Sequence, residues 1–372
     1  MKRRAFLGWS MVALTTRPLF AMLNDDKLND DKLNAASEIL SRATSSGQLR
    51  AAVVFMRQGR MVFQRAFGEA KNVDATFLLG SISKPIAVAA VMTLFDQGQF
   101  GLDDAVKKFV PEFHGDLKDR VTIRHLLTHV SGLPDQLPEN ANLRKSHAPL
   151  SEFVKETIRV PINFEPGTQY EYSSMAILLA TEIAQRISGI DFKEFVDSAV
   201  LRPLGMNHSA FGRGRLKPEE TMQCQVEFGA IESGGGSPDS KDWNWNSPYW
   251  RELGAPWGGA HASASDVGLF LDEFMHPSGK VFRPEVAKLM IQNHNQAGLE
   301  SRGLGLDVGM STSCVHCSEK KFGHTGSTGT IAWADPERDR ACVVLTTLPA
   351  GNLKDHPRQL VSDCITSTKA TE

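Results

Sequence analysis

The chain has 372 residues, of which 41% are apolar, so it is long and apolar enough to fold as two packed lobes. Its 41 Lys and Arg residues nearly balance 43 Asp and Glu residues, which leaves no basic field to hold a nucleic acid. Five cysteines are too few for a disulfide scaffold, and their odd number leaves at least one thiol unpaired within a monomer. This composition excludes a disordered chain, a collagen-like repeat and a multi-span membrane protein, and it predicts a soluble globular protein.

The first residues have the pattern of an export signal. Lys2, Arg3 and Arg4 precede an uncharged stretch at 5–16, which is too short to cross a bilayer as a helix of about 20 residues. The Arg pair with the following Ala-Phe-Leu resembles a twin-arginine signal. We expect residues 1–21 to be a cleaved signal, which implies a periplasmic or secreted protein with no stable membrane span after cleavage. A retained signal or an ordinary apolar helix is the alternative.

Residues 22–34 contain the sequence NDDKL twice, at 24–28 and 29–33, and we expect a solvated linker there. The other expected elements, in chain order, are a helix at 34–42, strands at 51–57 and 61–66 paired as a hairpin, helices from 81 to about 200, a loop at 228–260, a helix at 264–275, strands at 303–310, 330–334 and 341–347, and a helix at 354–366. Strands at both ends of the chain with helices between them predict one α+β domain at 35–372. Its α/β lobe would combine about 35–100 with 260–372, and its helical lobe would span about 101–259. A cleft between two such lobes is a usual place for a small-molecule site.

The candidate nucleophile is Ser81, in the sequence GSISK. An apolar run precedes it and a helix pattern follows it, so Lys84, three residues on, should project beside it. A serine hydroxyl needs a neighbouring base, and a desolvated lysine can serve as one because burial lowers the pKa of an ammonium group. The helix N-terminus adds a backbone N–H and a positive dipole end suited to an oxyanion. Ser318 also begins a Ser-x-x-Lys sequence, but a solvated turn is expected there.

Five motifs occur together in one order: GSISK, TIRHLLTHVSGL at 122–133, EPGTQYEYSS at 165–174, RPLGM at 202–206 and FGHTGSTGT at 322–330. In this combination the chain resembles the serine β-lactamase and penicillin-binding protein family, in its class C β-lactamase and family VIII esterase branch, over about residues 35–366. The resemblance implies an antiparallel sheet flanked by helices and an all-helical lobe. It also implies that Tyr172, with Lys84, moves the serine proton and protonates the leaving group.

Two positions depart from the family's motifs. Ser174 stands where the family has an Asn that grips a substrate amide, and Ser offers fewer donors and a shorter reach. His324, with Thr325 and Gly326, replaces a Lys-Thr-Gly motif, so a fixed positive charge becomes one that we expect to depend on pH. We therefore expect weaker preference for carboxylate-bearing substrates. The resemblance also places the backbone N–H of Ser327 opposite that of Ser81 in an oxyanion hole.

Other polar and aromatic residues invite functional interpretations. We assign structural roles to His125, His129 and His261. A group of loop aromatics would form either a substrate-binding wall or a pin for the loop, namely Trp243, Trp245, Tyr249, Trp250 and Trp257. Cys314 and Cys317 form a local disulfide or remain thiols. The sequence contains no second Cys/His pair for zinc and neither GxxxxGK[ST] nor GxGxxG, so we expect no metal and no cofactor.

The sequence thus predicts an exported serine hydrolase that cleaves an ester or amide bond of a small molecule or peptide through a Ser81 acyl-enzyme. A carboxylesterase or β-lactamase-like activity is the first expectation. The alternatives are a D-amino-acid peptidase or DD-carboxypeptidase acting on cell-wall peptides, and a non-catalytic muropeptide-binding protein on the same fold. The substrate and the oligomeric state stay open at this point.

Overall fold

The computed structural model describes residues 28–351, 353 and 355–366. Its main element is a six-stranded sheet in the order β2-β1-β9-β8-β7-β6, and each neighbouring pair is antiparallel. A smaller sheet has the order β3-β5-β4. The strands are β1 Ala51–Gln58, β2 Met61–Gly68, β3 Phe77–Leu78, β4 Ser209–Phe211, β5 Ala260–Ala262, β6 Asp307–Val308, β7 Phe322–Gly326, β8 Thr330–Asp335 and β9 Arg340–Thr346. The large sheet therefore joins strands from both ends of the chain.

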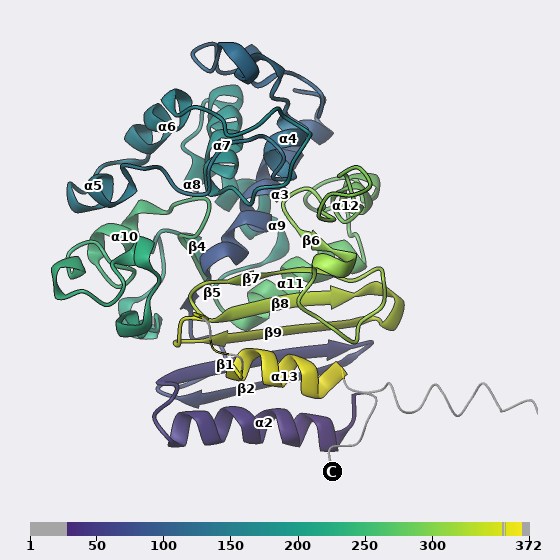
Figure 1. Cartoon of the computed structure of the whole chain (residues 1–372). Helices are drawn as coiled ribbons and strands as arrows, with labels where there is room; N and C mark the ends of the chain where they lie inside the picture. Colours follow the sequence, from purple (N-terminus) through teal and green to yellow (C-terminus); the bar gives the residue numbers. More distant parts are fainter. Residues whose placement is uncertain (1–27, 352, 354, 367–372) are drawn as a thin grey trace, which may run out of the picture.

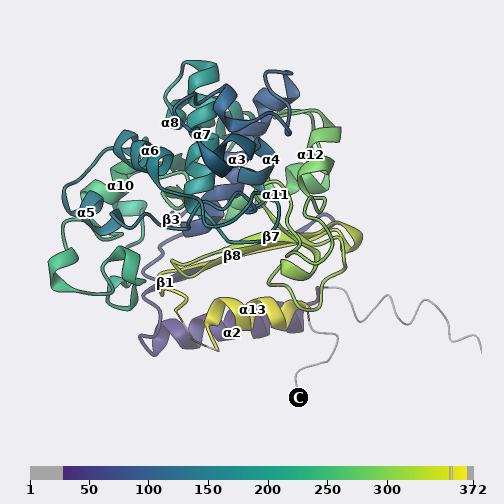
Figure 2. The ribbon, with the colours of Figure 1, turned by 45° about the horizontal axis from the view of Figure 1, so that its top comes forward.

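Helices cover both faces of this sheet (Figures 1 and 2). The α-helices are α2 Asp30–Ser45, α3 Ser83–Asp96, α4 Ile123–Leu127, α5 Asn140–Lys145, α6 Leu150–Arg159, α7 Ser174–Ser188, α8 Phe192–Val196, α9 Arg202–Leu204, α10 Pro248–Leu253, α11 Ala264–Met275, α12 Pro284–Met290 and α13 Pro357–Thr366. Figure 2 shows α2 and α13 side by side on one face, with the other helices gathered on the opposite face. The protein has a layer of two helices, a sheet and a larger helical body.

The alternation of side chains along β1 explains both faces. Ala52, Val54 and Met56 are buried in the cluster that includes α2 and α13. Val53 and Phe55 point the other way, into the cluster shared with α3 and α11. Since successive strand residues face opposite sides, a strand covered on both sides is apolar throughout, as this one is.

The predicted hairpin is confirmed. β1 pairs with β2 in a register that joins Ala51 to Gly68 and Gln58 to Met61. Gly59 lies in the turn with φ of 58°, a conformation that glycine adopts without strain. This hairpin is the edge of the large sheet.

The first described helix begins earlier than predicted. α2 starts at Asp30, and the side chain of Asn29 accepts a hydrogen bond of 3.0 Å from the amide of Lys32. Asp30 and Asp31 favour this start because their charges complement the positive end of the helix dipole. The linker prediction is therefore wrong for residues 30–34, whereas the predicted export signal lies outside the described residues.

The predicted strand at 303–310 is also mostly wrong, since only Asp307–Val308 forms a strand, β6. The preceding backbone turns instead, with Gly305 at φ of 79°. The amide of Gly305 donates to the carbonyl of Leu127, and that of Leu304 donates to Met290. A Cβ at Gly305 would lie 2.7 Å from Cβ of Val88, so this turn needs glycine to pack against α3.

The middle of the chain is helical with exceptions. The region 101–259 supplies α4 to α10, and it also supplies β4, which pairs with β5. One strand of the smaller sheet therefore falls within the range predicted for the helical lobe. The predicted loop at 228–260 contains α10, whose N-cap Ser247 accepts a hydrogen bond from the amide of Trp250. Tyr170 and Tyr172 of this region line one cavity together with His324, Thr325 and Gly326 of β7.

Candidate active site

Ser81 lies at the entrance to a buried helix. It occupies the 3₁₀ turn Gly80–Ile82, which leads directly into α3. Nζ of Lys84 donates a hydrogen bond of 3.0 Å to Oγ of Ser81 and another of 2.9 Å to the carbonyl of Trp257. The spacing of three residues therefore places the lysine beside the serine, as the sequence predicts.

Burial changes the chemistry of Lys84. The side chain is only 1% exposed. Desolvation lowers its pKa to about 7, against the smaller opposing effect of the carboxylate of Asp135. Near neutral pH a large fraction of Lys84 is an uncharged amine, which can accept the proton of Ser81.

Tyr172 faces the same two residues from the loop before α7. Nζ of Lys84 lies 4.7 Å from the centre of its ring. Burial raises the pKa of the phenol above its usual range, against the opposing effects of the charge of Arg302 and of hydrogen bonding with Ser81. Tyr172 therefore holds its proton at neutral pH and can donate it.

His129 supports this tyrosine. Its ring lies 4.6 Å from the ring of Tyr172, and its Nδ1 accepts a hydrogen bond of 3.1 Å from the amide of Ser173. Burial and the nearby charges of Arg302 and Lys84 hold the pKa of His129 well below its usual value. It is a neutral packing partner, in agreement with the structural role that we assign it.

Two glycines allow β7 to pack against the 3₁₀ turn that contains Ser81. Gly80 has φ of 58°, and a Cβ there would lie 2.9 Å from Oγ1 of Thr328 and 3.1 Å from the amide nitrogen of Ser327. Gly326 at the end of β7 is as close, because its Cβ would overlap the carbonyl oxygen of Leu79. The approach sets Ser327 beside Ser81, and both residues line the same cavities.

The structure corrects the expectation for His324. This residue is buried in β7, and burial together with the charges of Arg302 and Lys84 holds its pKa well below the usual value. Its Nε2 lies 2.8 Å from Nη2 of Arg302, and its Nδ1 lies 2.7 Å from the carbonyl of Thr325. Since a guanidinium can only donate, Nε2 accepts and Nδ1–H donates. The expected pH-dependent charge is wrong, because the imidazole is neutral.

Arg302, which the sequence analysis missed, carries a permanent charge in this part of the site. Arg302 is 2% exposed and forms an ion pair with Asp307. Both line a cavity of about 400 Å³ that also contains Ser81 and Tyr172. The rest of its lining is Tyr170, Glu300, Ser311, His324, Thr325, Gly326, Ser327, Ala350 and Arg358. No local motif marks Arg302, because its partner His324 is 22 positions away.

A second cavity, of about 160 Å³, opens on the other side of Ser81. It is lined by Gly80, Ser81, Asp135, Gln136, Arg144, Tyr172, Ser174, Glu232, Trp245, Trp250, Trp257, Gly258 and Ser327. Ser174, for which the sequence predicts a substrate contact, lies in its wall. However, Oγ of Ser174 donates a hydrogen bond of 2.6 Å to Oδ1 of Asp135, and its amide donates to the same oxygen. The only donor of the Ser174 side chain is thus already used by Asp135.

The aromatic residues of the loop divide between the two predicted roles. Trp245, Trp250 and Trp257 form a wall of the smaller cavity. Trp243 pins the loop, because its Nε1 donates to the carbonyl of Asp239 at 3.0 Å. Tyr249 donates to the carbonyl of Ala148 and faces away from Ser81.

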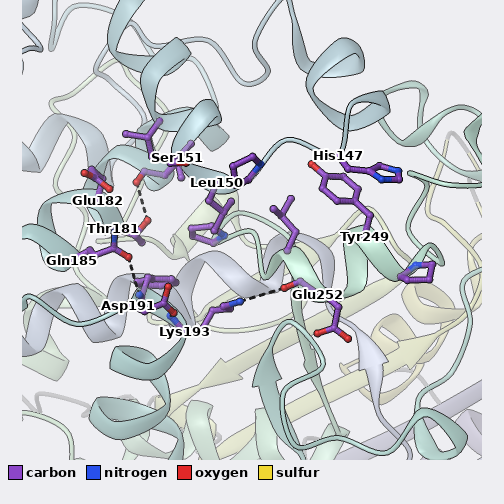
Figure 3. Close-up of a pocket in the computed structure, with 17 residues that line it drawn as sticks. His147, Leu150, Ser151, Thr181, Glu182, Gln185, Asp191, Lys193, Tyr249 and Glu252 are labelled. Atoms are coloured by element: carbon purple, nitrogen blue, oxygen red, sulfur yellow. Dashed lines mark hydrogen bonds between the residues drawn. The ribbon is translucent and has the colours of Figure 1, made fainter.

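Figure 3 shows the cavity that Tyr249 does face, between α6, α7, α8 and α10. Its volume is about 710 Å³, and Lys193 crosses it to reach the carbonyl of Glu252 at 3.5 Å. Its lining, within the described part of the chain, includes none of the predicted site residues. Volume alone therefore does not distinguish the cavity that contains the predicted nucleophile, Ser81.

The remaining histidines and cysteines have structural partners. His125 accepts a hydrogen bond of 3.3 Å from the amide of Thr122, in a box of hydrogen bonds that caps α4. His261 is buried in β5, with Nδ1 3.0 Å from the carbonyl of Gly212. Cys314 and Cys317 form a disulfide, which decides between the two states considered above.

Fold and site together define an α+β protein with a serine, a lysine and a tyrosine grouped in one cleft. The beta-lactamase family model matches residues 38–362, and the chain belongs to this family of serine hydrolases. Among the described residues, no helix is long and apolar enough to cross a membrane. No group of three or more metal-ligating side chains occurs within that same part of the chain.

Relatives carry names from two activities. A protein of Escherichia coli (strain K12) named "Putative D-alanyl-D-alanine carboxypeptidase" is 23% identical over 368 residues, which covers 87% of this chain and 83% of that protein. "Esterase EstB" of Burkholderia gladioli is 29% identical over 319 residues, covering 76% and 79%.

Solved structures share the fold. One titled "EstCE1, a hydrolase with promiscuous acyltransferase activity" has a TM-score of 0.74 at 19% identity, covering 91% of this chain and 99% of that one. A penicillin-binding protein homolog from Caulobacter crescentus has a TM-score of 0.72 at 21% identity, covering 90% and 97%. The fold is therefore that of the β-lactamases and penicillin-binding proteins.

Proposed function

We propose that this protein is a carboxylesterase that works through an acyl-enzyme on Ser81. The observation that carries the proposal is the buried amine of Lys84, with a pKa of about 7, 3.0 Å from Oγ of Ser81. Burying a lysine is costly to a fold, and groups with pKa values shifted in this way cluster at functional sites. The name of the Burkholderia gladioli relative, an esterase, agrees with this activity.

The reaction proceeds in two halves. Lys84 takes the proton of Ser81 as Oγ bonds to the ester carbonyl carbon, and the amides of Ser81 and Ser327 stabilise the oxyanion. The oxyanion collapses, the bond to the leaving oxygen breaks, and Tyr172 donates the proton that this oxygen needs. Water then adds to the acyl carbon, and deprotonated Tyr172 takes its proton. Lys84 returns a proton to Oγ of Ser81 as the bond to the acyl carbon breaks and the acid leaves.

The wall of the smaller cavity supports an ester rather than a β-lactam as substrate. The hydroxyl of Ser174 donates to Asp135, so it has no second proton for a substrate amide. The neighbouring imidazole of His324 is neutral, so it provides no charge for a substrate carboxylate. Both features weaken the grip that an acylamino β-lactam requires.

A second candidate is a carboxypeptidase that removes a C-terminal D-amino acid. Arg302 and Arg358 both line the larger cavity, which also contains Ser81. Their charges suit a C-terminal carboxylate, although Arg302 is already paired with Asp307. The carboxypeptidase names of the enterobacterial relatives point the same way.

The proposal includes export to the periplasm or medium through the signal at 1–21. The disulfide between Cys314 and Cys317 supports it, since disulfides persist in oxidising compartments. The test is cell fractionation with sequencing of the mature N-terminus, beside a variant with Arg3→Lys and Arg4→Lys. A mature chain that starts near Met22 and cytoplasmic retention of the variant are expected. Equal distribution of both proteins would refute the twin-arginine route.

The deciding experiment compares the mature protein with Ser81→Ala on three substrates: p-nitrophenyl butyrate, a chromogenic cephalosporin and a D-Ala-D-Ala peptide. We expect ester turnover to fall at least about a thousandfold in the variant, with slow turnover of the other two by either protein. Faster release of D-Ala than of ester would favour the carboxypeptidase. Binding of muropeptides without any turnover would leave a non-catalytic protein, and undiminished ester turnover by the variant would exclude Ser81.

A further inference from the structure

Two buried threonines hold the turn between β7 and β8 against the chain just before the nucleophile. Oγ1 of Thr328 donates a hydrogen bond of 2.7 Å to the carbonyl of Leu78. Oγ1 of Thr330 donates a hydrogen bond of 2.7 Å to the carbonyl of Leu79. The turn carries the amide of Ser327, so these bonds help to set the distance between that amide and the nucleophile.

Arg358 holds the same turn from α13, which lies on the face of the sheet opposite α3 (Figure 2). Its Nη1 donates a hydrogen bond of 2.5 Å to the carbonyl of Gly326 and one of 2.7 Å to the carbonyl of Thr330. Gly326 and Thr330 pair with each other where β7 ends and β8 begins. One nitrogen therefore bridges both ends of the turn and uses both of its hydrogens to do so. Burial lowers the pKa of Arg358 to about 10, which leaves the guanidinium charged at neutral pH.

The carbonyl of Gly326 and the N–H of Ser327 belong to the same peptide group. Because this group is planar and trans, a carbonyl that points to Arg358 directs the N–H the opposite way. Among the described residues, none accepts a hydrogen bond from this N–H. Hydrogen bonds in a chain polarise one another, so a charged donor on the carbonyl makes the N–H a stronger donor.

We propose that Arg358 is a positioning residue for the oxyanion hole, which holds and polarises the peptide between Gly326 and Ser327. The inference rests on the proposed hydrolysis at Ser81. Arg358 also lines the larger cavity, so binding of a substrate carboxylate is the competing role. A neutral ester distinguishes the two roles, because a residue that only binds a carboxylate has no effect on a substrate that lacks one.

The test compares Arg358→Met with Gln359→Met in the hydrolysis of p-nitrophenyl butyrate, which is a neutral ester. Gln359 is the matched control, because it is the next residue on α13 and its Nε2 donates to the carbonyl of Ser313 and not to the turn. Loss of a whole oxyanion donor costs about 10²–10³ in kcat, so loss of its support in Arg358→Met should lower kcat at least about tenfold. KM should change less than about twofold, since the oxyanion is absent from the bound ester. Gln359→Met should leave both constants as they are.

Three results of this comparison would overturn the proposal. The first is an unchanged kcat in Arg358→Met, and the second is an equal loss of kcat in Arg358→Met and Gln359→Met. The third is a loss that occurs with a D-Ala-D-Ala peptide but not with the neutral ester, which would assign Arg358 to the substrate carboxylate.

A conservative variant separates the charge on the carbonyl from packing. Arg358→Lys retains a cation that can donate to the carbonyl of Gly326, so its kcat should exceed that of Arg358→Met at least about threefold. Arg358→Gln takes the place of Arg358→Met if the methionine variant does not fold. Equal kcat in Arg358→Lys and in the neutral variant would refute a role for the charge.

A transition-state analogue separates this inference from the proposed function. Oγ of Ser81 adds to the boron of butylboronic acid as Lys84 takes its proton, and a boronate oxygen then occupies the place of the oxyanion without turnover. Calorimetry should show at least about tenfold weaker binding to Arg358→Met and unchanged binding to Gln359→Met. Binding that depends on Arg358 in a protein without Ser81-dependent ester turnover would refute the proposed function and retain the positioning role. Ser81-dependent turnover with equal kcat and equal boronate affinity in Arg358→Met would retain the function and refute the positioning role.

Discussion

The pKa of Lys84 predicts how the activity depends on pH. Desolvation lowers this pKa from 10.5 to about 7, which corresponds to about 5 kcal/mol at 1.36 kcal/mol per unit. Because only the neutral amine accepts the proton of Ser81, kcat/KM should rise with pH and level off above 7. At pH 8 about 90% of Lys84 is neutral and at pH 5 about 1%, so kcat/KM should fall about 90-fold between them.

The assay is hydrolysis of p-nitrophenyl butyrate from pH 5 to 9, read where nitrophenol and nitrophenolate absorb equally. Asp135→Asn removes a negative charge that raises the pKa of Lys84, so its acid limb should move to lower pH. His324→Gln is the matched control, because His324 lines the same cavity as Ser81. The pKa of His324 is already well below its usual value, so this change should leave the midpoint of the limb where it is.

Two results would contradict this reasoning. A flat profile between pH 5 and 8 would mean that Lys84 stays an ammonium group and that another residue is the base. If kcat/KM no longer falls at low pH in His324→Gln, the imidazole of His324 titrates in this range despite its burial in β7.

Three further predictions concern other parts of the structure. Tyr172→Phe should reduce kcat/KM for an ethyl ester by about 10²–10⁴, and less for a p-nitrophenyl ester, whose leaving group needs no proton; equal losses would exclude Tyr172 as the proton donor. Reduction of Cys314–Cys317, or their joint change to Ala, should lower the free energy of unfolding by about 2 kcal/mol in urea titration, since the closed loop is short. Arg302→Met should lower the free energy of unfolding by about 3–5 kcal/mol, because it leaves Asp307 buried without its ion-pair partner. Adding Asp307→Asn should restore most of this loss, and no recovery would show that the ion pair is not its source.

The sequence by itself determined the parts of the protein that depend on short-range spacing. Ser81 and Lys84 are three residues apart at the start of a helix, so helical geometry alone brings their side chains together. The hairpin of β1 and β2 follows from two β-branched runs separated by Gln58-Gly59. The order of the motifs indicated the family, and the match over residues 38–362 confirmed it.

Gly305 explains why the strand predicted at 303–310 does not form over its whole length. The run 303–310 is apolar and reads as a strand, but Gly305 turns the backbone so that its amide reaches Leu127 on α4. A hydrogen-bond partner so far away in sequence leaves no trace in the pattern of nearby residues.

The tertiary structure alone decided the charges and the hydrogen bonds of the site. His324 reads as a group that titrates near neutral pH, but burial beside Arg302 makes it neutral. The sequence predicts that Ser174 contacts substrate, but its hydroxyl donates its hydrogen bond to Asp135 instead. Arg302 carries no motif, and it joins the site only because the fold brings it beside His324. Protonation and pairing depend on desolvation and on neighbours that the fold brings together, and neither quantity is encoded in local sequence.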